Sequence, residues 1–240
     1  MPRRARLALA GVPVHIIQRG NDRKACFFED EDYGLYLHHL RDLGVRTGCR
    51  IHAYVLMTNH VHLLLTPKTA SSASLLMKHL GQRYVQYVNR SYQRTGTLWE
   101  GRFRSCLARE ESYVLACYRY IECNPLRAEM VKHPRQYKWS SYRVNAEGAA
   151  TNIVIPHQHY RALGNTESER QEAYKELFRT DIDPDVVKQI REATNGNYAL
   201  GSKRFQAHIE ATLGRRAIRG KPGRPVGLVD ADTLDLFDAR

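Results

Sequence analysis

The run from Thr58 to Leu65 is the stretch that most constrains the fold of this 240-residue chain. Its sequence, TNHVHLLL, is mostly apolar, and two of its residues are histidines that flank one valine. Side chains of a strand alternate between two faces, so His60 and His62 share one face and Val61 takes the other. Two strand residues span about 6.6 Å, which lets both imidazoles reach one divalent cation. The same pattern also fits two histidines that only form hydrogen bonds within an ordinary sheet. The metal-binding interpretation is favoured only if the rest of the chain supplies a third ligand and a reactive group.

The composition indicates a folded and strongly basic protein. Hydrophobic residues make up 42% of the chain, and 37 lysines and arginines face 25 acidic residues, for a net charge of +12. An excess of this kind favours a polyanionic partner such as nucleic acid. No apolar run approaches the roughly 20 residues that cross a membrane, and the N-terminus lacks a signal-peptide core. Five cysteines without a CxxC pair are typical of reduced thiols, so we expect a cytoplasmic, nucleoid-associated protein.

Hydrophobic periodicity predicts a regular order of elements in the first half of the chain. Alternation predicts strands and spacing by threes and fours predicts helices. The expected strands are 12–19, 50–57, 60–65 and one within 96–108, and the expected helices are 30–46, 71–89 and 113–123. The resulting order is typical of the split βαβ arrangement. We therefore expect an α+β fold, a ferredoxin-like antiparallel sheet with helices on one side.

The helix expected at 113–123 carries the candidate nucleophile. Tyr120 and Asn124 are four residues apart, so they share a helix face and are separated by about 6 Å of rise. A tyrosine hydroxyl can attack a phosphodiester and hold a covalent intermediate, and an amide oxygen can complete a metal site with two imidazoles. Tyr113 and Tyr118 are rivals for the same role. Spacing ranks Tyr120 first and leaves the choice open.

Arginines recur where the chain can meet a polyanion. Arg3 and Arg4 lie in a short basic arm, and Arg102 and Arg104 share one face of the fourth expected strand. Arginines also alternate with tyrosines near the end of the second helix, a pattern that suits phosphates with stacked bases or a half-buried aromatic stripe beside solvated arginines. The candidate DNA-binding residues are Arg3, Arg4, Arg19, Arg83, Arg102, Arg104 and Arg224.

Residues 146–214 are expected to form a helical extension to a domain at 1–145. Helical spacing predicts helices at 168–178, 184–193 and 201–213. Two helices around a glycine-containing turn are typical of a helix-turn-helix DNA reader, and a plain helical addition fits the same spacing. His157 and His159 form a second His-x-His pair. No carboxylate or cysteine cluster lies near them in the sequence, so we expect them to pack or to face solvent.

Residues 215–240 are expected to form a flexible tail that is basic at first and then acidic. Within it, Gly223-Arg224-Pro225 resembles the core of an AT-hook, whose extended arginine enters narrow minor grooves. A solvated basic linker fits the same composition.

Three stretches of the chain carry a family resemblance: HVHLLL, GTLWEGRFRS, and YRYIECNPLRAEMV followed by WSSY. They resemble the single-tyrosine HUH transposases, and among these the REP-associated tyrosine transposases of bacteria. The resemblance spans residues 1–145. It implies that His60 and His62 are the two HUH histidines, that Tyr120 is the nucleophile, and that Asn124 is the third ligand of Mg²⁺ or Mn²⁺.

The same resemblance implies an activity. Family members cleave single-stranded DNA next to a hairpin, and the expected product is a 5′-phosphotyrosine with a free 3′-hydroxyl, which allows strand transfer. Two alternatives stay open: a hairpin-binding protein without catalysis, and a replication-initiator-like HUH nickase. We expect a DNA hairpin of a repetitive palindromic element as partner, no membrane, and a monomer or homodimer.

Overall fold

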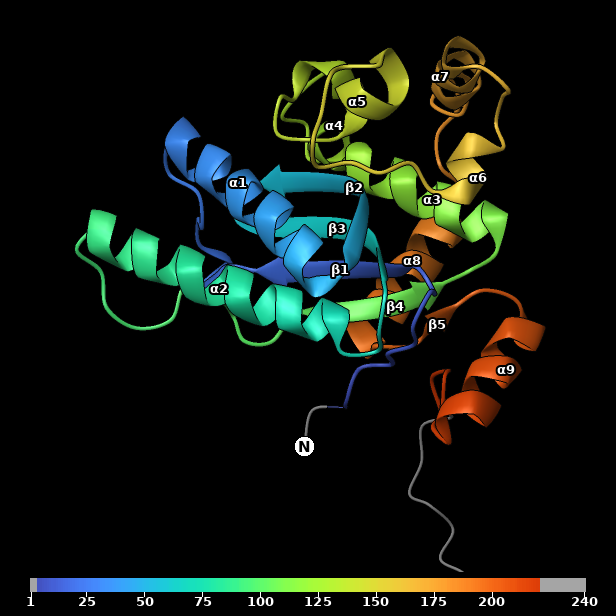
Figure 1. Cartoon of the computed structure of the whole chain (residues 1–240), viewed down its shortest axis with the longest axis horizontal. Coiled ribbons are helices and arrows are strands. Elements are labelled where there is room, and N and C mark those ends of the chain that lie inside the picture. Colours follow the sequence, from blue (N-terminus) through green and yellow to red (C-terminus); the bar gives the residue numbers. More distant parts are fainter. Residues whose placement is uncertain (1–3, 221–240) are drawn as a thin grey trace, which may run out of the picture.

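The computed structural model describes residues 4–220, so Arg3 and the AT-hook-like segment with Arg224 lie outside the described residues. A five-stranded sheet with the strand order β2-β3-β1-β4-β5 forms the centre of the fold (Figure 1). The strands are β1 (Val14–Arg19), β2 (Cys49–Met57), β3 (His60–Pro67), β4 (Arg104–Ala108) and β5 (Ala199–Leu200). The first four pair antiparallel, and β5 runs parallel to β4. The expected α+β fold is confirmed.

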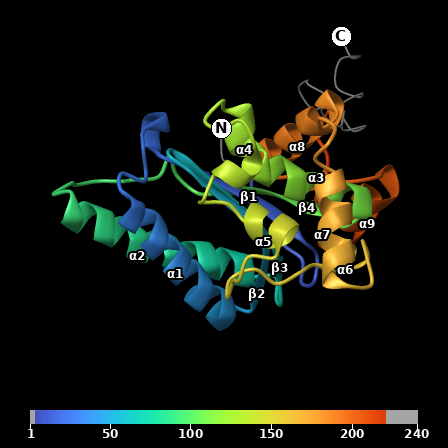
Figure 2. The same cartoon turned by 90° about the horizontal axis from the view of Figure 1, so that it is seen from above.

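Two long helices cover the first face of the sheet, as Figure 2 shows from above. They are α1 (Asp30–Thr47) and α2 (Ser72–Ser91). Helix α1 begins with a capping box between Glu29 and Asp32 and ends at Gly48, whose φ of 68° suits a residue without a Cβ. Leu63 and Leu65 of β3 join the core that these helices enclose.

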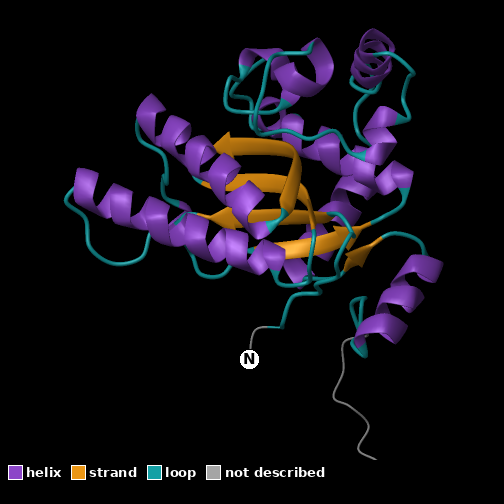
Figure 3. Ribbon diagram, viewed as in Figure 1, coloured by secondary structure: helices purple, strands orange, loops and turns teal. Residues whose placement is uncertain are grey.

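The second face of the sheet is also covered, which corrects the expectation of helices on one side (Figure 3). The helices α3 (Glu111–Glu122) and α8 (Pro184–Gly196) pack there, and Leu64 belongs to this second core. The physical reason lies in β3 itself. Its leucines are apolar on both faces, so a sheet with one open face would leave Leu64 in water. The even-numbered side chains of β3, including both histidines, therefore face the second layer.

The remaining helices are short and lie mostly after α3. They are α4 (Asn124–Arg127), α5 (Tyr142–Glu147), α6 (Gln158–Arg161), α7 (Glu167–Glu176) and α9 (Lys203–Leu213), with 3₁₀ turns at Asn21–Arg23 and Pro134–Gln136. None of the helices among residues 4–220 is long and apolar enough to span a bilayer. Proline restricts the backbone of the residue before it, so the Asn124-Pro125 step predicts a break in the helix, and α3 does end at Glu122 while α4 starts at Asn124.

The extension packs on the sheet. Tyr174 of α7 and Ile190 of α8 are buried in the second core, and β5 lengthens the sheet beside β4. The strand β5 escaped prediction because two residues are too short for a periodic pattern. It lies between α8 and α9, so these helices are not joined by the single short turn of a helix-turn-helix reader.

Candidate active site

A cleft of about 340 Å³ opens on the second face of the sheet, and the predicted catalytic and metal-ligating residues line it together. His60 and His62 reach it from β3, and Tyr120 reaches it from α3. Asn124 and Arg127 enter from α4. Residues of β1 and α8 complete the wall, so the cleft lies between the family-like segment and the extension.

Tyr120 is the tyrosine of α3 that faces this cleft. Its ring meets the ring of His62 edge-on at a centroid distance of 5.7 Å, and 7% of the residue is exposed. Tyr118 is fully buried, and its hydroxyl accepts a hydrogen bond from the backbone of His157. The Tyr113 hydroxyl donates to Gln189 instead. Among the three rivals, only Tyr120 presents its phenol to the histidines.

A chain of buried hydrogen bonds sets the tautomer of His62. The Thr194 hydroxyl donates to the carbonyl of Ile190 at 2.7 Å, so its oxygen accepts from Nδ1 of His15, at 3.1 Å. Nε2 of His15 is then unprotonated and accepts from Nδ1 of His62, at 2.8 Å. As a result, Nε2 of His62 keeps its lone pair. This is the tautomer that a metal-ligating histidine needs.

His60 is held in the same tautomer by its neighbour. Its Nδ1 lies 2.6 Å from the Asn59 amide oxygen, which can only accept, so Nε2 keeps its lone pair. Burial, followed by the charge of Arg19, lowers the pKa of His60 to about 4. Burial also lowers the pKa of His15 to about 3 and holds the pKa of His62 well below its usual value. Neutral imidazoles at pH 7 are ready to bind a cation without losing a proton first.

The donors at the cleft fit a small divalent cation. No group of three or more His, Cys, Asp or Glu side chains within residues 4–220 could hold a metal, so an amide would have to supply the third ligand. The Asn124 side chain lies close to His60, and the Asn124 amide nitrogen is buried without a partner among the described residues. Two imidazoles and one amide oxygen would leave coordination positions open, as in a catalytic metal site and unlike a closed structural zinc site.

Arg127 is a cleft residue that sequence reasoning missed. Its guanidinium lies 3.9 Å from the centre of the Tyr120 ring and donates to the Tyr120 carbonyl at 2.9 Å. Its Nε and Nη1 are buried with no hydrogen-bond partner, and it forms no ion pair with a carboxylate in the described chain. Buried N–H donors of a half-buried cation are costly to leave unpaired unless an anion joins them. The only signal in the sequence is its place one turn after Asn124.

Glu122 is a second residue that was missed, and it anchors the tyrosine helix. Its carboxylate is fully buried and accepts hydrogen bonds from Ser141, Asn145 and Tyr174 at 2.6 to 2.8 Å. Burial raises the pKa of this carboxyl to about 7. Residues two apart on a helix point to nearly opposite sides, so bonds that hold Glu122 inward turn Tyr120 toward the cleft.

The five predicted DNA-binding arginines within residues 4–220 fall into two groups. Arg19 of β1 lines the cleft, and Arg4, Arg102 and Arg104 line a neighbouring pocket with Arg19. Arg83 lies elsewhere, on α2 beside a pocket that α1 and α2 form on the first face. The second His-x-His pair packs as expected, with the buried ring of His157 capping α6.

Comparisons with known proteins agree with this fold. Residues 9–124 match the family model described as "Transposase IS200 like". A REP-associated tyrosine transposase bound to a REP hairpin is similar in structure, with 17% identity and a TM-score of 0.50 over 65% of this chain and 93% of that chain. A candidate transposase from Deinococcus radiodurans is 19% identical with a TM-score of 0.35, over 57% of this chain and 95% of that one. No curated protein matches the sequence.

Proposed function

We propose that the protein, whose residues 9–124 match the family model of the IS200-like transposases, is a metal-dependent, single-stranded DNA endonuclease and strand transferase. One observation carries this proposal: Tyr120 and the two histidines of β3 line the same cleft. Its substrate is single-stranded DNA next to a repeat hairpin. The similar structure whose description names a REP hairpin supports that choice of partner.

The metal site of this proposal consists of His60, His62 and Asn124, which would hold Mg²⁺ or Mn²⁺. When bound there, the cation supplies Lewis-acid charge to the scissile phosphate. The protein contributes by keeping both imidazoles neutral, with their Nε2 lone pairs available.

The chemistry of strand cleavage belongs to Tyr120. Its hydroxyl loses its proton to solvent and attacks phosphorus, and the bond to the 3′-oxygen of the neighbouring nucleotide breaks. That oxygen takes up a proton, which leaves a free 3′-hydroxyl and a 5′-phosphotyrosine. The unused N–H groups of Arg127 donate to the phosphate while negative charge builds up on it. Attack by another 3′-hydroxyl reverses the reaction and joins two strands without an external energy source.

The decisive experiment looks for the covalent adduct. A labelled hairpin oligonucleotide with single-stranded flanks is incubated with the protein and Mn²⁺ and then separated under denaturing conditions. We expect a DNA–protein adduct that Tyr120→Phe abolishes and that Tyr113→Phe, the matched change on the same helix, retains. An adduct that survives in Tyr120→Phe contradicts the assignment. Tight hairpin binding without any adduct in the unaltered protein would favour a binding protein without catalysis.

A further inference from the structure

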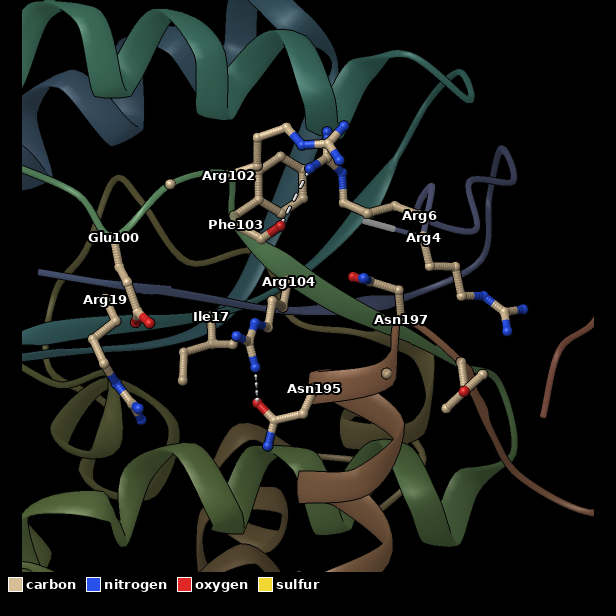
Figure 4. Close-up of a pocket in the computed structure, with 13 residues that line it drawn as sticks. Arg4, Arg6, Ile17, Arg19, Glu100, Arg102, Phe103, Arg104, Asn195 and Asn197 are labelled. Atoms are coloured by element: carbon tan, nitrogen blue, oxygen red, sulfur yellow. Dashed lines mark hydrogen bonds between the residues drawn. The ribbon is translucent and has the colours of Figure 1, made fainter. Parts of the chain in front are cut away.

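A second pocket, of about 350 Å³, opens beside the reaction cleft and shares Ile17, Arg19 and Asn195 with it. Its positive side chains come from the N-terminal arm, from β1, and from β4 with the loop before it (Figure 4). We call it the arginine pocket after Arg4, Arg6, Arg19, Arg102 and Arg104. Because the two hollows share a wall, a strand that leaves the cleft can continue directly into this pocket.

The charge of the arginine pocket is unbalanced. Among residues 4–220, none of its five arginines forms an ion pair with a carboxylate. Glu100 is the one acidic residue in its lining, and it too forms no ion pair within the described chain. Five positive charges against one negative charge create a field that attracts an anion.

Aromatic rings, rather than carboxylates, hold Arg4 and Arg6 in place. The guanidinium of Arg6 stacks 3.8 Å from the centre of the Phe103 ring and donates to the Phe103 carbonyl at 3.2 Å. Arg4 lies 4.5 Å from the ring centre of Tyr198. Burial, and then the like charge of Arg102, lower the pKa of Arg6. The pocket therefore holds like charges together before any ligand arrives, which raises its affinity for an anion.

Two asparagines of the extension add hydrogen-bond donors. The Asn195 amide oxygen accepts from Nη1 of Arg104 at 3.1 Å, and the Asn197 amide oxygen accepts from the backbone N–H of Ser105 at 3.0 Å. A guanidinium and a backbone N–H can only donate, so both amide orientations are determined. Neither amide nitrogen donates to another group in the described chain, which leaves both available to a ligand that offers acceptors, as phosphodiester oxygens do.

The extension is fixed to the sheet at this point. Asn197 has a φ of 54° and ends α8, a left-handed position that asparagine tolerates well. The chain then enters β5, which pairs with β4, the strand that begins at Arg104. The segment that carries the two asparagines is therefore tied to the strand that begins at Arg104, which fixes the spacing between them.

We propose that the arginine pocket binds backbone phosphates of the unpaired nucleotides on one side of the scissile phosphate, and that the extension completes it through Asn195 and Asn197. This inference rests on the proposed function, because it places cleavage in the adjoining cleft. A recess of about 350 Å³ can enclose about one nucleotide, which fits a single strand better than a whole duplex. The extension thus acts on the single strand beside the hairpin.

The test compares two DNA probes in the presence of a chelator, so that binding is measured without cleavage. One probe is a hairpin with oligothymidine flanks on both sides, and the other is the same hairpin with blunt ends. We expect Arg102→Gln to weaken binding of the flanked probe by about tenfold and to leave the blunt probe unchanged. The slope of log affinity against log salt should shrink by about 0.7, the value for one single-strand phosphate.

Two further variants sharpen the result. Asn195→Asp keeps the acceptor for Arg104 but replaces the donor nitrogen with a negatively charged oxygen. It should therefore weaken binding of the flanked probe at least as much as Arg102→Gln does. Arg46→Gln removes an exposed arginine from the last turn of α1, outside both hollows, and is the matched control. We expect it to bind both probes like the unaltered protein. Removing one flank at a time then identifies the side of the cut that the pocket holds.

The outcomes separate this inference from the proposed function. Equal losses on both probes, or an Arg46→Gln loss as large as that of Arg102→Gln, would overturn the pocket assignment even if the Tyr120 adduct forms. A loss confined to the flanked probe supports the pocket even if no adduct forms. If the loss is confined to the flanked probe and no adduct forms, the proposed function is wrong, but the arginine pocket is still a binding site for single strands.

Discussion

Nε2 of His15 lies 2.8 Å from Nδ1 of His62, and this buried contact decides which nitrogen of His62 faces the cleft. His15 in turn is held by Thr194 of α8, 179 residues further along the chain. The extension therefore reaches the candidate metal site through one intermediate side chain. Groups that orient metal-ligating histidines in this way typically contribute about 10- to 100-fold to metal affinity.

The first prediction concerns this contact. In His15→Leu, Nδ1 of His62 loses its acceptor and the ring is no longer held in one tautomer, so Mn²⁺ affinity should fall about 10- to 100-fold. Mn²⁺ titration followed by electron paramagnetic resonance, without DNA, measures this directly. His52→Leu is the matched control, since it removes another buried histidine of the sheet that lies outside the cleft. Equal Mn²⁺ affinity in the two variants would contradict a positioning role.

The second prediction concerns Arg127. Its Nε and Nη1 have no partner in the described chain, so Arg127→Gln should slow adduct formation by about 100-fold under single-turnover conditions. Unfolding by urea provides the second readout. A purely structural role would lower stability, whereas a group that waits for phosphate should leave it unchanged or raised. Arg119→Gln, on α3 but outside the cleft, is the control and should keep the rate of the unaltered protein.

The third prediction concerns the anchor of the tyrosine helix. Glu122→Ala leaves the hydroxyls of Ser141 and Tyr174 and the amide of Asn145 without their shared acceptor. The free energy of unfolding should fall by about 3 to 5 kcal/mol, as measured by urea denaturation. Glu192→Ala removes an exposed carboxylate of α8 and should change little. A loss as small as that of the control would show that Glu122 does not hold α3.

The fourth prediction concerns pH. His52 is buried, its Nδ1 donates to the Ile155 carbonyl at 2.6 Å, and burial lowers its pKa to about 3. The unfolded chain, with an ordinary histidine pKa of about 6.5, takes up this proton at higher pH than the folded chain does. The contribution of His52 is therefore fully present above pH 6.5, and falls by up to about 1.4 kcal/mol per pH unit as the pH drops toward 3.

His52→Asn isolates this effect, because its amide nitrogen can still donate to Ile155. The difference in unfolding free energy between the unaltered protein and this variant should shrink as the pH is lowered from 7 to 4. Urea denaturation at several pH values measures the difference. A difference that stays constant across this range would show that His52 is not the titrating group.

The local spacing of residues in the sequence was enough to predict which side chains of β3 and of the tyrosine helix line the cleft. The alternation of β3 places His60 and His62 on the same face, and helical spacing places Tyr120 near Asn124. Pro125 ends α3 before Asn124, yet Cys123 stays close to helical angles, with φ −83° and ψ 1°. The chain thus keeps its direction through the break, so the four-residue spacing of Tyr120 and Asn124 still brings both residues to the same place.

Residues that depend on distant neighbours escaped sequence reasoning. Arg127 and Glu122 carry charge, and charged residues on a helix are usually solvated. Arg127 is half-buried because it stacks on Tyr120 and lies beside α8 in the cleft, and Glu122 is buried because it accepts from three donors of later segments. The two-residue strand β5 has no period to detect, although it fixes the extension beside β4.

The order of strands and helices in the first half of the chain, the basic charge and the shared face of the two histidines were determined by the sequence alone, because periodicity and composition are local properties. Which tyrosine faces the histidines, which tautomer His62 adopts and which arginines gather beside the cleft were decided only by the tertiary structure. Each of these three features depends on contacts between side chains that are far apart in the sequence and meet in the buried interior. Their hydrogen bonds and charges take effect only once the second face of the sheet is covered.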